Sequence, residues 1–81
     1  MKYKIQFKSN VRKDLKKIDK KFLDKIFDSI SKLENNLEGD VKKLTNFIPE
    51  YRLRIGDYRV LFEIENNHVT IYKIVHRKEA Y

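Results

Sequence analysis

Three arginines lie within a short, otherwise largely apolar stretch of this sequence, at Arg52, Arg54 and Arg59. Lysine supplies most of the positive charge in the first 25 residues, whereas arginine is preferred after residue 50. A guanidinium group is a planar fork of donors that binds two phosphate oxygens at once, while the lysine ammonium is a mobile point charge. The distribution therefore predicts a phosphate-binding site in the second half of the chain. The alternative is that arginine merely suits strands better than lysine does.

The turn expected at Gly56-Asp57 determines how the arginines are arranged, because a two-residue turn fixes the pairing of a hairpin. With this turn, Arg54 lies directly opposite Arg59, and Arg52 shares their face of the sheet. Like charges directly opposite one another destabilise a sheet by about 0.2–1 kcal/mol per pair. Such a concentration of charge is explained if an anion binds there. The other face is expected to pack against helices and carries Tyr51, Leu53, Ile55, Tyr58, Val60, Phe62 and Ile64.

A second two-residue turn, at residues 66–67, extends the same sheet. Its register places Tyr72 opposite Leu61, where the ring is suited equally to stacking on a nucleobase or to packing. The same register directs Lys73 toward the helices, which breaks the pattern. Either its ammonium group reaches water at the edge of the sheet, or a β-bulge after Ile71 shifts the pairing.

Several functional groups follow the last expected strand, where protein scaffolds often place chemistry. Arg77 and Lys78 add positive charge, and Tyr81 adds a phenol. His76 is an additional catalytic candidate, because histidine ordinarily changes its charge near neutral pH. We interpret Glu63 as a counter-charge to a neighbouring arginine rather than as a catalytic carboxylate. With two histidines and no cysteine, neither a metal site nor a cofactor is expected.

The elements that position these residues follow from the spacing of apolar residues. Apolar residues alternate near the N-terminus, recur at helical spacing up to Gly39, and alternate again afterwards. Asp19 is expected to cap the second helix. The predicted fold class is α+β: an N-terminal strand, an antiparallel two-helix hairpin, and a 3–4-stranded, mainly antiparallel sheet packed on the helices, in one domain of residues 1–81. Strands are expected at 2–8, 51–55, 58–64 and 69–75, with a weaker one at 41–47, and the first helix at 11–18.

The overall charge narrows the class of partner. A net charge of +7 and a pI of about 9.7 favour a polyanion, which binds with release of counterions. No run approaches the ~20 apolar residues that span a bilayer, so no membrane association is expected. The N-terminal sequence does not have the pattern of a signal peptide, and a cytoplasmic location is expected.

The motif R-x-G-D-Y-R-V, within residues 51–63, and the motif H-R-x-x-x-Y, within residues 75–81, resemble the RelE/ParE toxin family of type II toxin–antitoxin systems. The resemblance is closer to the RelE-type mRNA interferase branch. It implies a RelE-like toxin and hydrolase: a ribosome-dependent endoribonuclease that cleaves mRNA in the A site by attack of the 2′-hydroxyl, and so inhibits translation. The alternatives on the same scaffold are a ParE-like inhibitor of DNA gyrase and a non-catalytic, antitoxin-binding relative. The implied partners are a RelB-like antitoxin, the ribosome with its mRNA, and operator DNA bound through the antitoxin complex.

The same resemblance assigns roles to residues. It implies that Arg52, Arg54, Arg59 and Arg77 clamp the scissile phosphate, and that Tyr81 orients or stacks on the substrate. The expected RNA-binding set is Arg52, Arg54, Arg59, Tyr72, Arg77 and Lys78.

One departure from the family pattern concerns the proton acceptor. Well-studied RelE-type enzymes have lysines where this chain has Arg52 and Arg54. Arginine side chains stay protonated in proteins and are therefore poor proton acceptors. Two hypotheses remain: either His76 accepts the proton, as histidine does in some relatives, or water or the ribosome does.

Overall fold

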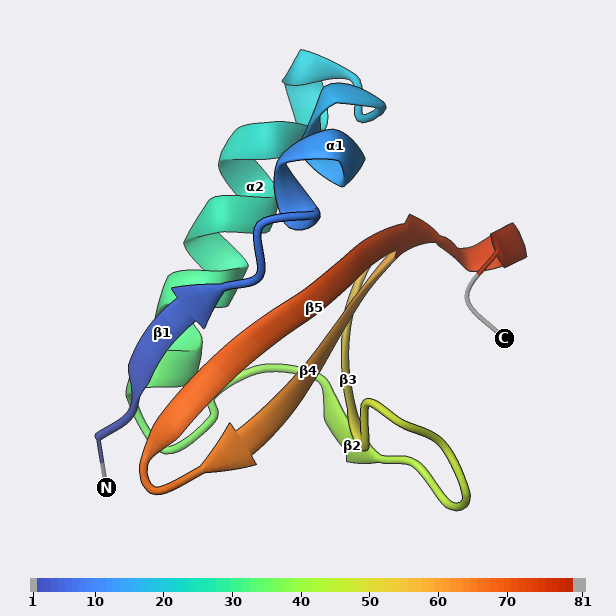
Figure 1. Ribbon diagram of the computed structural model, residues 1–81. Helices are drawn as coiled ribbons and strands as arrows, with labels where there is room; N and C mark the ends of the chain where they lie inside the picture. The colour runs from blue at the N-terminus through green and yellow to red at the C-terminus, as the bar shows by residue number, and fades with distance from the viewer. Residues whose placement is uncertain (1, 80–81) are drawn as a thin grey trace.

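The computed structural model describes residues 2–79, in which two helices cover one face of a five-stranded sheet (Figure 1). An N-terminal strand leads into the two helices, and a meander of strands completes the chain. The elements are β1 (Lys4–Phe7), α1 (Val11–Lys16), α2 (Lys20–Ser31), β2 (Val41–Lys43), β3 (Tyr51–Ile55), β4 (Tyr58–Glu65) and β5 (His68–His76), with short 3-10 turns η1 (Lys32–Glu34) and η2 (Arg77–Glu79).

The strand order is β1-β5-β4-β3-β2, and all neighbouring strands except β1 and β5 are antiparallel. The predicted α+β class is confirmed, but the expected 3–4-stranded sheet is too small. The N-terminal strand joins the sheet in parallel with β5, and Ile5 lies opposite Val69. The weak strand expected at 41–47 is reduced to Val41–Lys43. Parallel pairing between segments some sixty residues apart leaves no mark on local periodicity, which explains the difference.

Local signals account for the helices. The Asp19 side chain accepts a hydrogen bond from the backbone N–H of Lys21, at 3.1 Å, and thereby begins α2. The first helix is only Val11–Lys16, so the helical hairpin has one short arm. Gly39 lies beyond α2 at a φ of +132°, where a Cβ would stand 2.9 Å from Cδ1 of Leu53. This close approach requires glycine before the chain enters β2.

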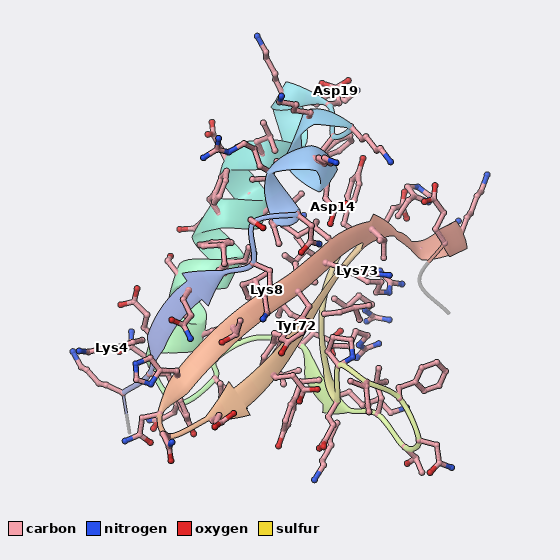
Figure 2. The ribbon with its side chains drawn as sticks, in the orientation of Figure 1. Lys4, Lys8, Asp14, Asp19, Tyr72 and Lys73 are labelled. Carbon is pink, nitrogen blue, oxygen red and sulfur yellow. The ribbon has the colours of Figure 1, made fainter. Side chains whose placement is uncertain are left out.

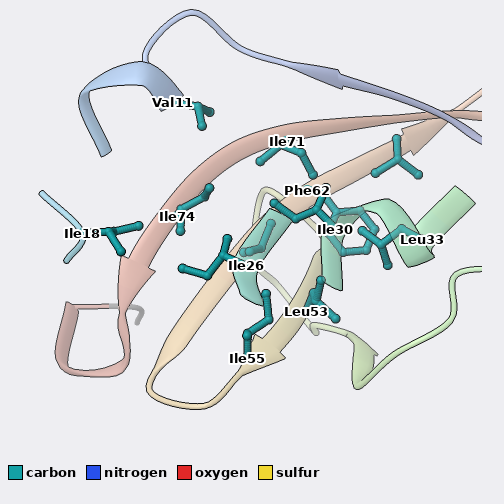
Figure 3. Close-up of a cluster of buried hydrophobic side chains, with 12 residues drawn as sticks. Val11, Ile18, Ile26, Ile30, Leu33, Leu53, Ile55, Phe62, Ile71 and Ile74 are labelled. Atoms are coloured by element: carbon teal, nitrogen blue, oxygen red, sulfur yellow. The ribbon is translucent and has the colours of Figure 1, made fainter. Parts of the chain in front are cut away.

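A single core lies between the helices and one face of the sheet (Figure 3). Ile26 and Ile30 of α2 and Leu33 of η1 are buried against Leu53 and Phe62 of the sheet. Burying such side chains contributes on the order of 1.5–3 kcal/mol each. The other face of the sheet is not covered by the helices, and it is called the open face below. Within residues 2–79, no helix is long and apolar enough to cross a membrane.

Candidate functional site

The hairpin of β3 and β4 has the predicted register, and it gathers the three arginines on the open face. Arg54 pairs directly with Arg59, and Arg52 pairs with Leu61. The neighbouring strand β2 adds Lys42, which pairs with Arg52 and so shares its face. Four cations from three adjacent strands therefore lie on one side of the sheet.

Asp40, just before β2, binds two of these arginines and is the functional-site residue that sequence reasoning missed. Its Oδ2 lies 2.7 Å from Nε of Arg54, and its Oδ1 lies 3.4 Å from Nη2 of Arg52. The backbone N–H of Arg54 also donates to the carbonyl oxygen of Asp40, at 3.0 Å. One carboxylate is thus shared by two guanidinium groups, and Lys42 and Arg59 leave the face with a net positive charge. The Asp after Gly39 is the sequence signal that could have drawn attention to it.

Arg59 and Arg77 lie around the β3–β4 turn. Nη1 of Arg59 donates to the carbonyl oxygens of Gly56 and Tyr58, at 2.8 and 2.9 Å. The backbone N–H of Arg77 donates to the carbonyl oxygen of Asp57, at 2.7 Å, and its Nε lies 3.7 Å from the carboxylate of that residue. The turn therefore brings Arg77, which follows β5, to the end of the sheet that carries Arg59.

A β-bulge at Tyr72 changes the facing of the residues that follow it. Phe62 pairs with Ile71, but the preceding residue Leu61 pairs with Lys73, so Tyr72 is the extra residue. The register expected for Tyr72 is therefore wrong, and the alternative of a bulge after Ile71 is confirmed. Ile71 and Ile74 are both buried toward the helices, which leaves Tyr72 and Lys73 on the open face. The three-residue interval between these isoleucines is the signal of the bulge in the sequence.

Figure 2 shows Tyr72 and Lys73 on β5, with Lys8 beside the tyrosine. Nζ of Lys8 lies 5.0 Å from the centroid of the Tyr72 ring, within the range of a cation–π contact. The positive charge of the open face therefore continues from β2 to the end of β1, and an aromatic ring lies within it.

His76 is not brought together with the arginines. It pairs with Tyr58, and the two rings meet edge to face on the helix side, with centroids 5.5 Å apart. Both rings line a cavity of about 220 Å³, together with Phe22 of α2. Nδ1 of His76 also accepts a hydrogen bond from the backbone N–H of Lys78, at 3.3 Å. The structure thus gives the imidazole neighbours on the face opposite to the arginines.

The remaining candidates have the following positions. Glu63 does not act as the expected counter-charge: its Oε2 accepts a hydrogen bond from the backbone N–H of Glu50, at 3.0 Å, and Asp40 pairs with the arginines instead. Lys78 lies in the turn η2 after β5. Tyr81 lies outside the described residues. Among residues 2–79, no group of three or more acidic, histidine or cysteine side chains could hold a metal ion.

Comparison with known proteins shows what this arrangement is similar to. Residues 5–81 match the family model described as the ParE toxin of type II toxin-antitoxin system, parDE. A curated relative, Toxin RelE3 of Methanocaldococcus jannaschii, is 34% identical over 47 residues, which are 58% of this chain and 53% of the relative. The chain thus spans about half the length of that curated relative.

Solved structures are similar over almost the whole chain. The RelB-RelE antitoxin-toxin complex from Methanococcus jannaschii contains a chain with a TM-score of 0.79 and 29% identity, and the match covers 94% of each chain. The archaeal RelE-RelB complex from Pyrococcus horikoshii OT3 gives a TM-score of 0.75 at 27% identity, covering 99% of this chain and 100% of the other. Together with the family match over residues 5–81, these likenesses show that the chain belongs to the RelE/ParE family of toxins from type II toxin–antitoxin systems.

Proposed function

We propose that this protein is a ribosome-dependent endoribonuclease that cleaves mRNA in the A site and so inhibits translation. Arg52, Arg54, Arg59 and Arg77 bind the scissile phosphate, and Tyr81 orients the substrate. Tyr72 and Lys78 contribute to RNA binding beside this clamp.

The observation that carries the proposal is the direct pairing of Arg54 with Arg59 on the open face. Side chains paired in this way have Cβ atoms about 4.5–5.5 Å apart, so their positive charges repel. Asp40 offsets part of this repulsion, since its carboxylate is shared between Arg54 and Arg52. An RNA phosphate supplies the remaining negative charge and accepts the charge-assisted hydrogen bonds that guanidinium groups make best.

The proposed reaction needs no cofactor. The 2′-oxygen of the ribose bonds to the adjacent phosphorus, the bond from phosphorus to the 5′-oxygen breaks, and that oxygen leaves with a proton. Negative charge develops on the phosphoryl oxygens as the bonds exchange, and fixed guanidinium groups stabilise it. Because His76 contacts Tyr58 on the helix side, we assign removal of the 2′ proton to water or to the ribosome, and the position of His76 does not support its role as the acceptor.

The proposal includes partners of two kinds. RelB-RelE and RelE-RelB complexes are among the solved structures that this chain is similar to. We therefore expect a RelB-like antitoxin to hold this chain inactive and to connect it to operator DNA. The net charge of +7 favours association with the ribosome and its mRNA, because neutralised phosphates release counterions.

A ParE-like inhibitor of DNA gyrase is the second candidate, and the match of residues 5–81 to the ParE toxin model favours it. It uses the same scaffold without a nuclease site. It predicts that Arg52, Arg54 and Tyr81 can be replaced without loss of toxicity.

Induction of the chain without an antitoxin, followed by mapping of mRNA 5′ ends, tests the proposal. Cuts in phase with translated codons are expected. Intact transcripts with broken DNA would instead support the gyrase inhibitor, and normal growth with intact nucleic acids would support a non-catalytic relative.

The clamp is tested in the same assay with a double variant, Arg52→Gln with Arg54→Gln, which should abolish the cuts. The matched control, Lys13→Gln with Lys17→Gln, removes the same charge at or near α1. If both double variants cut equally, the arginine face is not the site.

A further inference from the structure

Segment 8–14 makes three hydrogen bonds to β5 around the bulge. The backbone N–H of Lys8 donates to the carbonyl oxygen of Ile71, at 2.9 Å. Nδ2 of Asn10 donates to the carbonyl oxygen of Tyr72, at 2.8 Å. These contacts join residues far apart in the sequence at the one place where the β4–β5 pairing is irregular.

Asp14 completes this set from α1. Its Oδ2 accepts a hydrogen bond from the backbone N–H of Ile74, at 3.1 Å (Figure 2 shows Asp14 between α1 and β5). β1 ends at Phe7, opposite Ile71, so the edge of β5 beyond Ile71 has no strand beside it. An unpaired buried backbone group costs about 1–3 kcal/mol. Asn10 precedes α1 at the capping position but makes no side-chain cap bond there. Its side chain bonds the bulged residue Tyr72 instead, and that of Asp14 bonds Ile74, two residues further along β5.

The bulge has a direct consequence for the open face. Without it, Lys73 would face the helices and Tyr72 would pair with Leu61, as strict alternation requires. With it, Lys73 pairs with Leu61 and lies diagonally across from Arg59, about 7–8 Å away at the Cα atoms. Lys73 is exposed, so its ammonium group is accessible to a ligand on this face.

We propose that the bulge positions Lys73 on the open face as a further phosphate-binding residue beside the arginine clamp. Asn10 and Asp14 hold the bulge in place through their hydrogen bonds to β5. The inference rests on the proposed function and deepens it. Lys73 binds the RNA phosphate next to the one held by the arginines, while the base between them stacks on Tyr72. Asn10 and Asp14 do not contact RNA and act only through the backbone of β5.

Binding of the full chain to a short single-stranded RNA with 2′-O-methyl groups, which cannot be cleaved, tests the role of Lys73. We expect Lys73→Gln to weaken binding about two- to fivefold at low salt, as for an exposed ion pair. The slope of log Kd against log salt should fall in magnitude by about 0.7, the value for one phosphate contact to a single strand. The control Lys20→Gln removes the same charge at the start of α2. Equal effects of the two variants would overturn the proposal.

Two variants of Asp14 isolate the positioning role. Asp14→Asn and Asp14→Ala remove the same negative charge, but only alanine removes the acceptor for the Ile74 N–H. Asp14→Ala should therefore bind RNA about two- to fivefold more weakly than Asp14→Asn, and this difference should vanish when Lys73→Gln is also present. If the two Asp14 variants bind equally, or if the difference persists without Lys73, the positioning role is refuted.

A second variant, at Asn10, separates a loss of RNA binding from a failure to fold. Asn10→Ala breaks the bond to the Tyr72 carbonyl and leaves α1 otherwise intact, and its circular dichroism and melting temperature report folding separately from RNA binding. It should reproduce the loss seen with Asp14→Ala. The inference can fail while the proposed function stands. If Arg52→Gln with Arg54→Gln weakens RNA binding while Lys73→Gln does not, only the inference is refuted. Absence of salt-dependent RNA binding by the parent refutes the inference, whereas the proposed function is decided by the mapping of mRNA 5′ ends.

Discussion

Replacing Asp40 by asparagine should destabilise the fold while strengthening RNA binding. The carboxylate of Asp40 lies 2.7 Å from Nε of Arg54 and 3.4 Å from Nη2 of Arg52. Asparagine preserves the size of the side chain and one acceptor oxygen but removes the negative charge. The backbone bond from the N–H of Arg54 to the carbonyl oxygen of residue 40 should survive. The variant therefore isolates the electrostatic contribution of this carboxylate.

The expected magnitude follows from the exposure of the partners. The side chains of Asp40 and Arg54 are 46% and 55% exposed, so water screens this pair, and it contributes about 0.2–1 kcal/mol. The pair with Arg52, whose side chain is 14% exposed, is screened less and contributes at least as much. Without the carboxylate, the repulsion between Arg54 and Arg59 is no longer offset, which costs about 0.2–1 kcal/mol more. We expect a loss of about 1–2 kcal/mol, and a domain of this size loses about 4–8 °C in melting temperature per kcal/mol.

Thermal unfolding at low and high salt measures this loss. The Debye length falls from about 10 Å at 0.1 M to about 3 Å at 1 M, so the difference between Asp40→Asn and the parent should shrink by at least half in high salt. In the RNA-binding assay, the same variant should bind about two- to fivefold more tightly, because the phosphate no longer competes with an internal anion.

Asp28→Asn is the control, because Asp28 is 69% exposed and pairs with a single lysine, Lys32, at 3.6 Å. It should cost no more than about 0.3–0.5 kcal/mol and leave RNA binding unchanged. The reasoning is refuted if Asp40→Asn is no less stable than Asp28→Asn at low salt, or if its destabilisation does not depend on salt.

His76→Gln should leave the pH–rate profile of ribosome-dependent cleavage unchanged, because His76 contacts Tyr58 on the helix side; a shifted profile would restore its role as proton acceptor. Gly56→Ala should cost about 1–2 kcal/mol in denaturant unfolding, because its φ of +56° is left-handed although a Cβ there would meet no atom within 4 Å. Gly39→Ala should cost more than Gly56→Ala, because a Cβ would also stand 2.9 Å from Cδ1 of Leu53; equal losses would contradict the steric argument.

The arrangement of the arginines could be predicted because it depends on local information alone. Alternation assigns a side chain to one face of a strand, and a two-residue turn fixes the partner of every residue in the hairpin. The predicted pairing of Arg54 with Arg59 was therefore confirmed. The cap at Asp19 was equally local, since it concerns a backbone N–H two residues away.

The sequence by itself thus determined the helices, the hairpin register and the concentration of arginine on one face. Only the tertiary structure decided the features that need partners distant in the sequence: the parallel pairing of β1 with β5, the bonds from Asn10 and Asp14 that fix the bulge, and the position of Asp40 between Arg52 and Arg54. The physical reason is the range of each interaction. Strand alternation and turn geometry act within a few residues. A backbone group of β5 beyond the end of β1, by contrast, is paired only by polar side chains that the packed segment 8–14 places beside it.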